Sequence, residues 1–204
     1  IPPFIATLGM MMITKGLSLV LSKATPIYFT DTKGFDQISM GNIIPWLGIP
    51  NAVYIFLVMA LIASFMLNKT IFGRYTFAIG SNAEATRLSG VNVKKWETNV
   101  YIVNGIFFGI AGIVMASRLG SAQPALGQGY ELEAIAAVVI GGTSLAGGTG
   151  TILGTVIGAF IMSVLSNGLK TMAVPQEWQT VVIGFVVILA VYIDILRRKK
   201  QRSS

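Results

Sequence analysis

The chain has 204 residues, of which 53% are hydrophobic and only 11% are charged, whereas soluble domains carry roughly 25% charged residues. Its long apolar runs, without the alternating pattern of a barrel, predict an all-α polytopic transmembrane bundle. Cysteine and histidine are both absent, which excludes disulfides and removes the commonest metal ligand and the commonest general base. We therefore predict no catalytic residue, no metal site and no cofactor.

The chain begins at Ile1 and leads directly into an apolar segment. It has neither the charged n-region nor the small-residue cleavage site of a signal peptide. We expect residues 1–204 to form a single transmembrane domain that is a fragment, with the N-terminal part of the domain missing.

The first expected span covers residues 4–21 and contains Lys15, followed by Gly16. An ionisable side chain inside a span can mark a transport path. It can equally extend to the nearer membrane interface or join a structural ion pair. The residues alone leave these interpretations open.

Further expected spans lie downstream, and the first of them starts properly near Pro50, since proline is tolerated in a first helical turn. The third span has Gly105, Gly109 and Gly112 on one face, which suits close helix packing. The spans after the first are predicted at residues 43–67, 99–117, 151–169 and 178–196.

The most unusual stretch is residues 130–158, which joins two acids, a short apolar run and a cluster of glycines. The apolar run, residues 134–146, would be about 20 Å long as a helix, too short for the ~30 Å hydrocarbon core. A half-length segment of this kind suggests a broken helix packed inside a bundle. Gly150, Gly154 and Gly158 are expected on one helical face, where they allow close backbone approach.

The formal charge of +7 comes from basic residues concentrated in two segments outside the expected spans, as the positive-inside rule predicts for a membrane protein. We therefore expect no nucleic-acid partner. Five basic residues lie in the segment 68–97, five in the C-terminal tail, and four in all other connections. The positive-inside rule therefore places segment 68–97 and the tail in the cytoplasm. Parity allows this only if the half-length segment completes a crossing.

Within segment 68–97, residues 81–90 predict a short helix. Ser81 followed by Glu84 has the spacing of a capping box, and Gly90 is a natural C-terminal stop. A helix of about two turns is too short to be stable alone in water. It is either a docking element for a cytoplasmic partner or a loop helix lying on its own bundle, and the residues alone do not decide.

Nucleotide binding by this chain is not expected. The run from Gly147 to Thr151 lacks the Lys-Ser/Thr ending of a P-loop, and Leu153 stands where a dinucleotide fingerprint needs its third glycine. Buried acids suited to a proton relay are also missing from the spans. The chain is therefore not expected to hydrolyse ATP or to be a proton-coupled transporter.

Uncharged polar residues within the membrane segments could line a path for a neutral hydroxylated solute. The candidates are Asn104, Thr143 and Ser144. The alternative for each is an ordinary interhelical hydrogen bond.

Two stretches together resemble the membrane permease subunit of ribose-type ABC sugar importers. They are GRYTFAIGSNAEATRLSGVNVKKW at residues 73–96 and YELEAIAAVVIGGTSLAGGTGTILGTVIGA at residues 130–159. The resemblance implies a homodimer in the bacterial inner membrane, surrounded by lipid. It also implies a separate cytoplasmic ATPase and an extracytoplasmic sugar-binding protein as partners. Lys15-Gly16 fits the basic residue that the family commonly has before a glycine in this span.

The resemblance also assigns roles to the two motifs. The short helix becomes the element that couples to the ATPase, formed by Ser81, Asn82, Glu84, Ala85, Arg87, Leu88 and Gly90. The glycine stretch becomes packing surface beside the translocation path, formed by Gly141, Gly142, Gly147, Gly148, Gly150, Gly154 and Gly158.

The expected function is thus the non-enzymatic, channel-forming subunit of an ATP-driven importer for ribose or a related simple sugar, with its C-terminus in the cytoplasm. The alternative is a stand-alone secondary sugar transporter or facilitator. The cytoplasmic capping-box helix and the lack of buried acids favour the importer.

Overall fold

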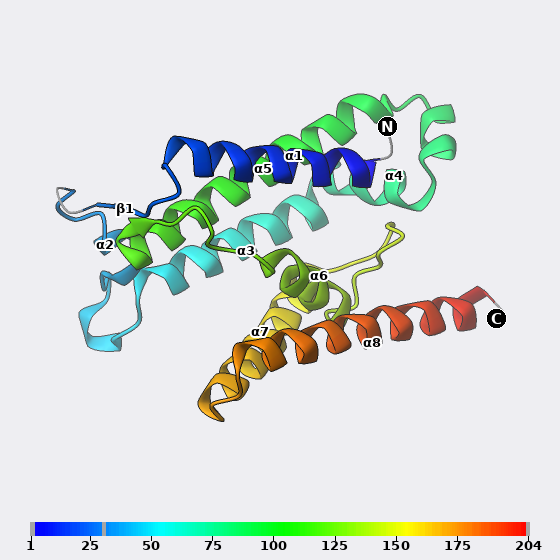
Figure 1. The fold of residues 1–204 in the computed structure, drawn as a ribbon. Helices are drawn as coiled ribbons and strands as arrows, with labels where there is room; N and C mark the ends of the chain where they lie inside the picture. Colours follow the sequence, from blue (N-terminus) through cyan, green and yellow to red (C-terminus); the bar gives the residue numbers. More distant parts are fainter. Residues whose placement is uncertain (1–2, 30–31, 203–204) are drawn as a thin grey trace. The chain divides into compact units, whose positions relative to one another are not determined.

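The structure is a computed structural model that describes residues 3–29 and 32–202, and helices form most of it (Figure 1). The side chains of the basic tail, residues 197–202, lie outside the described part. In chain order the elements are α1 (Pro3–Leu21), β1 (Ile27–Tyr28), α2 (Gln37–Met40), the 3-10 helix η1 (Pro45–Leu47), α3 (Asn51–Lys69), α4 (Ile71–Leu88), α5 (Val93–Leu119), β2 (Ser121–Ala122), α6 (Tyr130–Ile140), α7 (Ile152–Thr171) and α8 (Gln176–Arg202). The predicted all-α helical membrane class is confirmed.

Three helices of the described chain are long and apolar enough to cross a membrane, namely α3, α5 and α7. Shorter apolar helical stretches occupy Ile5–Leu21 in α1 and Gln176–Tyr192 in α8. Each predicted span therefore coincides with a helix. The second begins at Asn51, directly after Pro50, as predicted from that proline.

Contacts divide the chain into two compact units. The first consists of Ile1–Leu57 and Gly105–Gln128, and the second of Val58–Asn104 and Gly129–Ser204. Both sequence motifs singled out above lie in the second unit.

The first unit is tied together by hydrogen bonds around Ser117, which is 1% exposed near the end of α5. Its hydroxyl donates to the carbonyl of Phe35 (2.7 Å) and accepts from the N–H of Ser39 (3.0 Å). These bonds hold the short helix α2 against α5. The strands β1 and β2 add a two-residue antiparallel pairing in the same unit.

The second unit contains the most tightly packed part of the chain, where α6 lies against α7 and α8 (Figure 1). Ala136 and Ala137 of α6 are buried together with Met162 of α7. Because the α6 side chains here are small, the helices approach closely, and packing of this kind is what associates helices in a membrane.

The half-length segment is shorter than its apolar run predicts, because α6 ends at Ile140 and residues 141–151 form a loop. Gly142 adopts a positive φ of 86°, and two bonds close the helix end: Gly142 N–H to Val139 (2.9 Å) and Thr143 N–H to Val138 (3.1 Å). This is the Schellman arrangement that glycine favours. The prediction of an apolar helix over residues 134–146 was wrong at both ends, since α6 also includes the two acids at its start.

Candidate functional site

The loop between α6 and α7, residues 141–151, is called the glycine loop below. Ser144 N–H donates to the carbonyl of Thr149 (3.0 Å), and Gly147 N–H donates to the carbonyl of Ser144 (3.0 Å). Gly147 and Gly148 both have positive φ, 88° and 79°, which L-residues adopt only with strain. The loop is therefore a hydrogen-bonded turn that needs glycine in its backbone.

Gly154 and Gly158 of α7 lie directly against the α6 backbone. A Cβ on Gly154 would overlap the carbonyl oxygen of Gly141, and one on Gly158 would overlap the carbonyl oxygen of Ala137. Gly150 is not part of this helical face, contrary to the predicted ladder. It precedes α7, whose N-cap is Thr151, and faces the side chain of Thr143 instead.

The predicted path-lining residues fall in two places. Thr143 and Ser144 are half-buried neighbours in the glycine loop, whereas Asn104 is exposed on α5. The structure thus places two of the three candidates together.

The predicted coupling helix forms the end of α4, after a break at Asn82. The backbone of Asn82 is extended (φ −157°, ψ 98°), so α4 consists of two helical segments, residues 71–81 and 83–88. The side-chain carbonyl oxygen of Asn82 accepts from the N–H of Ala85 (3.0 Å), which is N-cap geometry. The capping box predicted from Ser81 was therefore wrong. Ser81 and Asn82 are both good N-cap types. Asn82 is the one that has the extended backbone of an N-cap.

Residues 83–88, called the coupling segment below, present their side chains almost wholly to the surroundings. Glu84 and Arg87 form an ion pair on this surface (3.1 Å) with side chains that are 75% and 68% exposed, and Leu88 is 78% exposed. Thr86 is 8% exposed and donates to the carbonyl of Asn82 (2.8 Å). One buried residue thus anchors a segment whose other side chains are exposed.

The coupling segment ends as predicted. Gly90 adopts φ 84°, while its N–H and that of Val91 return to the carbonyls of Arg87 (3.0 Å) and Thr86 (3.4 Å). This is again a Schellman closure.

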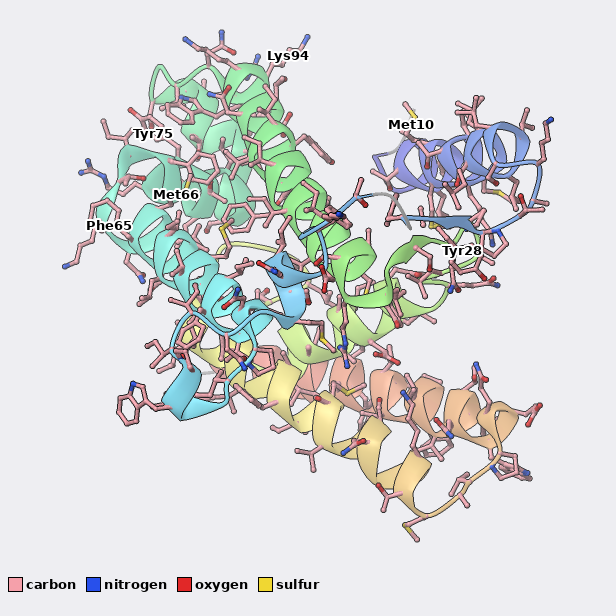
Figure 2. The ribbon with its side chains drawn as sticks, turned by 90° about the vertical axis from the view of Figure 1, so that its left-hand side faces the viewer. Met10, Tyr28, Phe65, Met66, Tyr75 and Lys94 are labelled. Atoms are coloured by element: carbon pink, nitrogen blue, oxygen red, sulfur yellow. The ribbon has the colours of Figure 1, made fainter. Side chains whose placement is uncertain are left out.

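Three aromatic rings, which sequence reasoning missed, join α4 to the start of α5. Trp96 stacks edge-to-face on Tyr75, with ring centroids 4.9 Å apart, and on Phe72, at 6.5 Å. Figure 2 shows Tyr75 on α4 and Lys94 near the start of α5, in the same part of the second unit. The spacing of Phe72 and Tyr75, three residues apart on one helical face, was the available signal. The cluster holds the α4 segment that precedes the coupling segment.

A contact between α4 and the glycine loop was also missed. The loop reaches beyond α6 and α7 toward α4 (Figure 1), and Gly80 of α4 meets Gly147 and Gly148 backbone to backbone. No pattern in the sequence pairs these glycines, because a residue without a side chain carries no signal of its partner.

Lys15, in the first unit, has a neutral partner. Its ammonium group donates to the side-chain carbonyl of Gln128 (3.2 Å). The structural ion pair considered for Lys15 is therefore not the interaction found, while a position beside a transport path stays a prediction.

Comparison with known proteins gives consistent matches. The family described as "Branched-chain amino acid transport system / permease component" matches residues 1–191. The ribose import permease protein of Escherichia coli K12 is 46% identical over 97% of this chain and 61% of its own length. That of Bacillus subtilis is 44% identical, over 97% and 60%.

The xylose transport system permease protein of Haemophilus influenzae is 47% identical over 75% of this chain and 41% of its own length. The chain thus spans about three fifths of the curated ribose permeases that it matches. No solved structure matches it.

Proposed function

The chain belongs to the family described as the permease component of branched-chain amino acid transport systems, and on that premise we propose that it is the channel-forming subunit of an ATP-driven importer for ribose or a related simple sugar. In this proposal it sits in the bacterial inner membrane as part of a homodimer. Its partners are a cytoplasmic ATPase subunit and an extracytoplasmic sugar-binding protein.

The observation that carries the ATP-driven part is the coupling segment. It is a capped helical segment that exposes Leu88 and the ion pair of Glu84 and Arg87. The exposed Leu88 offers an apolar contact, and the pair of Glu84 and Arg87 offers charged ones. Both suit insertion into a surface cleft of a partner. This favours docking over the alternative that the residues alone left open.

The substrate class rests on the relatives and on the polar residues of the glycine loop. The ribose and xylose permeases are 44–47% identical to this chain, whereas the family description names branched-chain amino acids. Thr143 and Ser144 supply uncharged hydroxyls, which can hydrogen-bond to a sugar. A free amino acid carries a carboxylate and an ammonium, for which charged or strongly dipolar groups are the better match.

The orientation follows from charge. The coupling segment must lie in the cytoplasm to meet an ATPase, and the positive-inside rule assigns the C-terminal tail to the same side. ATP binding would close the two ATPase subunits, and the coupling segments would transmit that motion to the bundle.

Uptake into proteoliposomes tests the proposal. The full-length permease is reconstituted with its ATPase subunit and binding protein, and labelled ribose, xylose and leucine are compared. We expect uptake of one of the sugars that requires ATP, and no uptake of leucine. Leucine uptake would overturn the sugar assignment. Sugar uptake that persists without the ATPase subunit would instead establish the stand-alone transporter.

A further inference from the structure

We infer that Gly80, Gly147 and Gly148 are positioning residues, through which movement of the coupling segment reaches the glycine loop. This inference rests on the proposed function. It assigns to Gly80 a role that neither the coupling helix nor the glycine ladder predicts.

The contact is between main chains. A Cβ added to Gly80 would lie 2.7 Å from the backbone nitrogen of Gly148, and one added to Gly147 would lie 2.7 Å from the carbonyl oxygen of Gly80. Real Cβ atoms essentially never come this close to a neighbour. Because no flexible side chain lies between the two segments, a displacement of one is passed directly to the other.

The contact lies immediately beside the break in α4. Gly80 stands two residues before Asn82, and a Cβ on Gly148 would also lie 3.0 Å from the Cα of Ser81, the residue next to the break. The coupling segment begins on the far side of Asn82. A tilt of that segment therefore acts on the backbone at the point where the glycine loop rests on α4.

The receiving side is built to move as one piece. The bonds from Ser144 to Thr149 and from Gly147 to Ser144 close the loop on itself. Its two ends are held as well, by the α6 Schellman closure and by Gly154 of α7 packed on Gly141. A push at Gly147 and Gly148 would thus displace Thr143 and Ser144, the proposed path residues, and load the α6–α7 junction.

The rival explanation is that these glycines merely permit α4 and the glycine loop to pack. The two explanations differ in what a small added side chain does. If the contact couples the two activities, a methyl group added there lowers transport while ATP hydrolysis continues. If the contact only permits packing, the methyl group lowers the amount of assembled complex, and both activities fall together.

Gly80→Ala in the full-length, fully assembled transporter makes this distinction. Gly168→Ala is the matched control, because Gly168 is also helical and a Cβ there would meet nothing within 4 Å. We expect Gly80→Ala to assemble and to hydrolyse ATP, while sugar transported per ATP falls about tenfold, within the range known for residues that couple two sites. Gly168→Ala should keep the wild-type ratio. An unchanged ratio in Gly80→Ala, or a parallel loss of both activities, would overturn the inference.

A disulfide reports on the contact independently of folding defects in Gly80→Ala. The chain has no cysteine, and a Cβ on Gly148 would lie 3.1 Å from the Cβ of Ser81. A disulfide spans roughly 3.5–4.5 Å between its Cβ atoms, so a shift of a few tenths of an ångström lets the bond form. Ser81→Cys combined with Gly148→Cys should cross-link within one chain both with and without ATP, and neither single variant should. Cross-linking lost in either nucleotide state would show that the two segments do not move together.

The outcomes also separate this inference from the proposed function. If the wild-type assembly shows no ATP-driven uptake, both fail. If it does, and the coupling ratio of Gly80→Ala equals that of the wild type, only the inference fails.

Discussion

Gly141 at the end of α6 and Gly154 in the first turns of α7 lie backbone against backbone, so that a Cβ on either would overlap the main chain of the other. Gly158 repeats the contact one turn later, against the carbonyl of Ala137. This junction lets an eleven-residue helix pack against a full-length one within a few residues of the glycine loop. The stability of the bundle should therefore depend on these positions lacking side chains.

Replacing Gly154 by leucine should disrupt this junction. Forcing four carbons into a backbone contact costs about 1–3 kcal/mol or more in overpacking. Gly168→Leu on the same helix is the control, because a Cβ at Gly168 meets nothing within 4 Å. Thermal stability and dimerisation in detergent are the measurements. Stability of Gly154→Leu equal to that of Gly168→Leu would contradict the close packing.

Reversing the charge of Glu84 should abolish sugar transport while leaving membrane insertion intact. The Glu84–Arg87 pair is exposed, and such pairs contribute at most about 1 kcal/mol to stability, so Glu84→Arg should still fold. Its effect would fall on docking to the ATPase. Co-purification of the ATPase subunit and sugar uptake are the measurements.

The control for this charge reversal is Glu97→Arg, which makes the same change at an exposed position outside the coupling segment. It should keep both ATPase association and uptake. Wild-type behaviour of Glu84→Arg in both assays would remove Glu84 from the coupling role.

Replacing Gly90 by valine should act on the same docking step by a different route. Gly90 has φ 84°, a conformation in which a β-branched residue is a true outlier. The closure of the coupling segment should therefore be lost, and ATPase association and transport with it. Gly168→Val is the comparison, since a Cβ at Gly168 meets nothing within 4 Å and Gly168 is not among the positive-φ glycines. Equal activity of the two variants would exclude a need for this helix end.

Cysteine labelling should place Ser89 and Lys33 on opposite sides of the membrane. Both are exposed, and the absence of native cysteine leaves each introduced thiol as the sole target. Ser89→Cys should react with a membrane-impermeant reagent only from the cytoplasmic side, and Lys33→Cys only from the outside. A permeant reagent, which labels both, controls for reactivity. Labelling of both from one side would refute the crossing by α3, and with it the topology on which the parity argument rests.

Removing the hydroxyl of Ser117 should destabilise the first unit. Ser117→Ala loses the bonds to Phe35 and Ser39, at a cost of about 1 kcal/mol for a buried hydrogen-bonded hydroxyl. Ser163→Ala, at an exposed position on α7, should lie within about 0.5 kcal/mol of the wild type. Thermal unfolding of the full-length protein in detergent compares them. Equal midpoints would mean that the bonds of Ser117 do not hold α2 to α5.

The sequence by itself determined the helical membrane class and the positions of the five predicted spans. Hydrophobic run length decides these, because transfer into a bilayer depends mainly on composition over about twenty residues. The family was also readable from the sequence, through the resemblance of the two motifs at residues 73–96 and 130–159 to known permeases. The stop at Gly90 was also readable, since a helix end in the left-handed conformation favours glycine locally.

Only the tertiary structure decided which residue caps the coupling segment, where α6 ends and what the glycines touch. Ser81 and Asn82 are nearly equal as N-caps, and the extended backbone at Asn82 in the folded chain shows that Asn82 is the cap. Gly154 and Gly158 meet the backbone of α6, and Gly150 meets Thr143. Gly147 and Gly148 meet Gly80. A glycine in the sequence indicates that another segment can approach closely at that position. It does not identify that segment, because it has no side chain whose chemistry would match a partner. The partner is set by the path of another segment far along the chain.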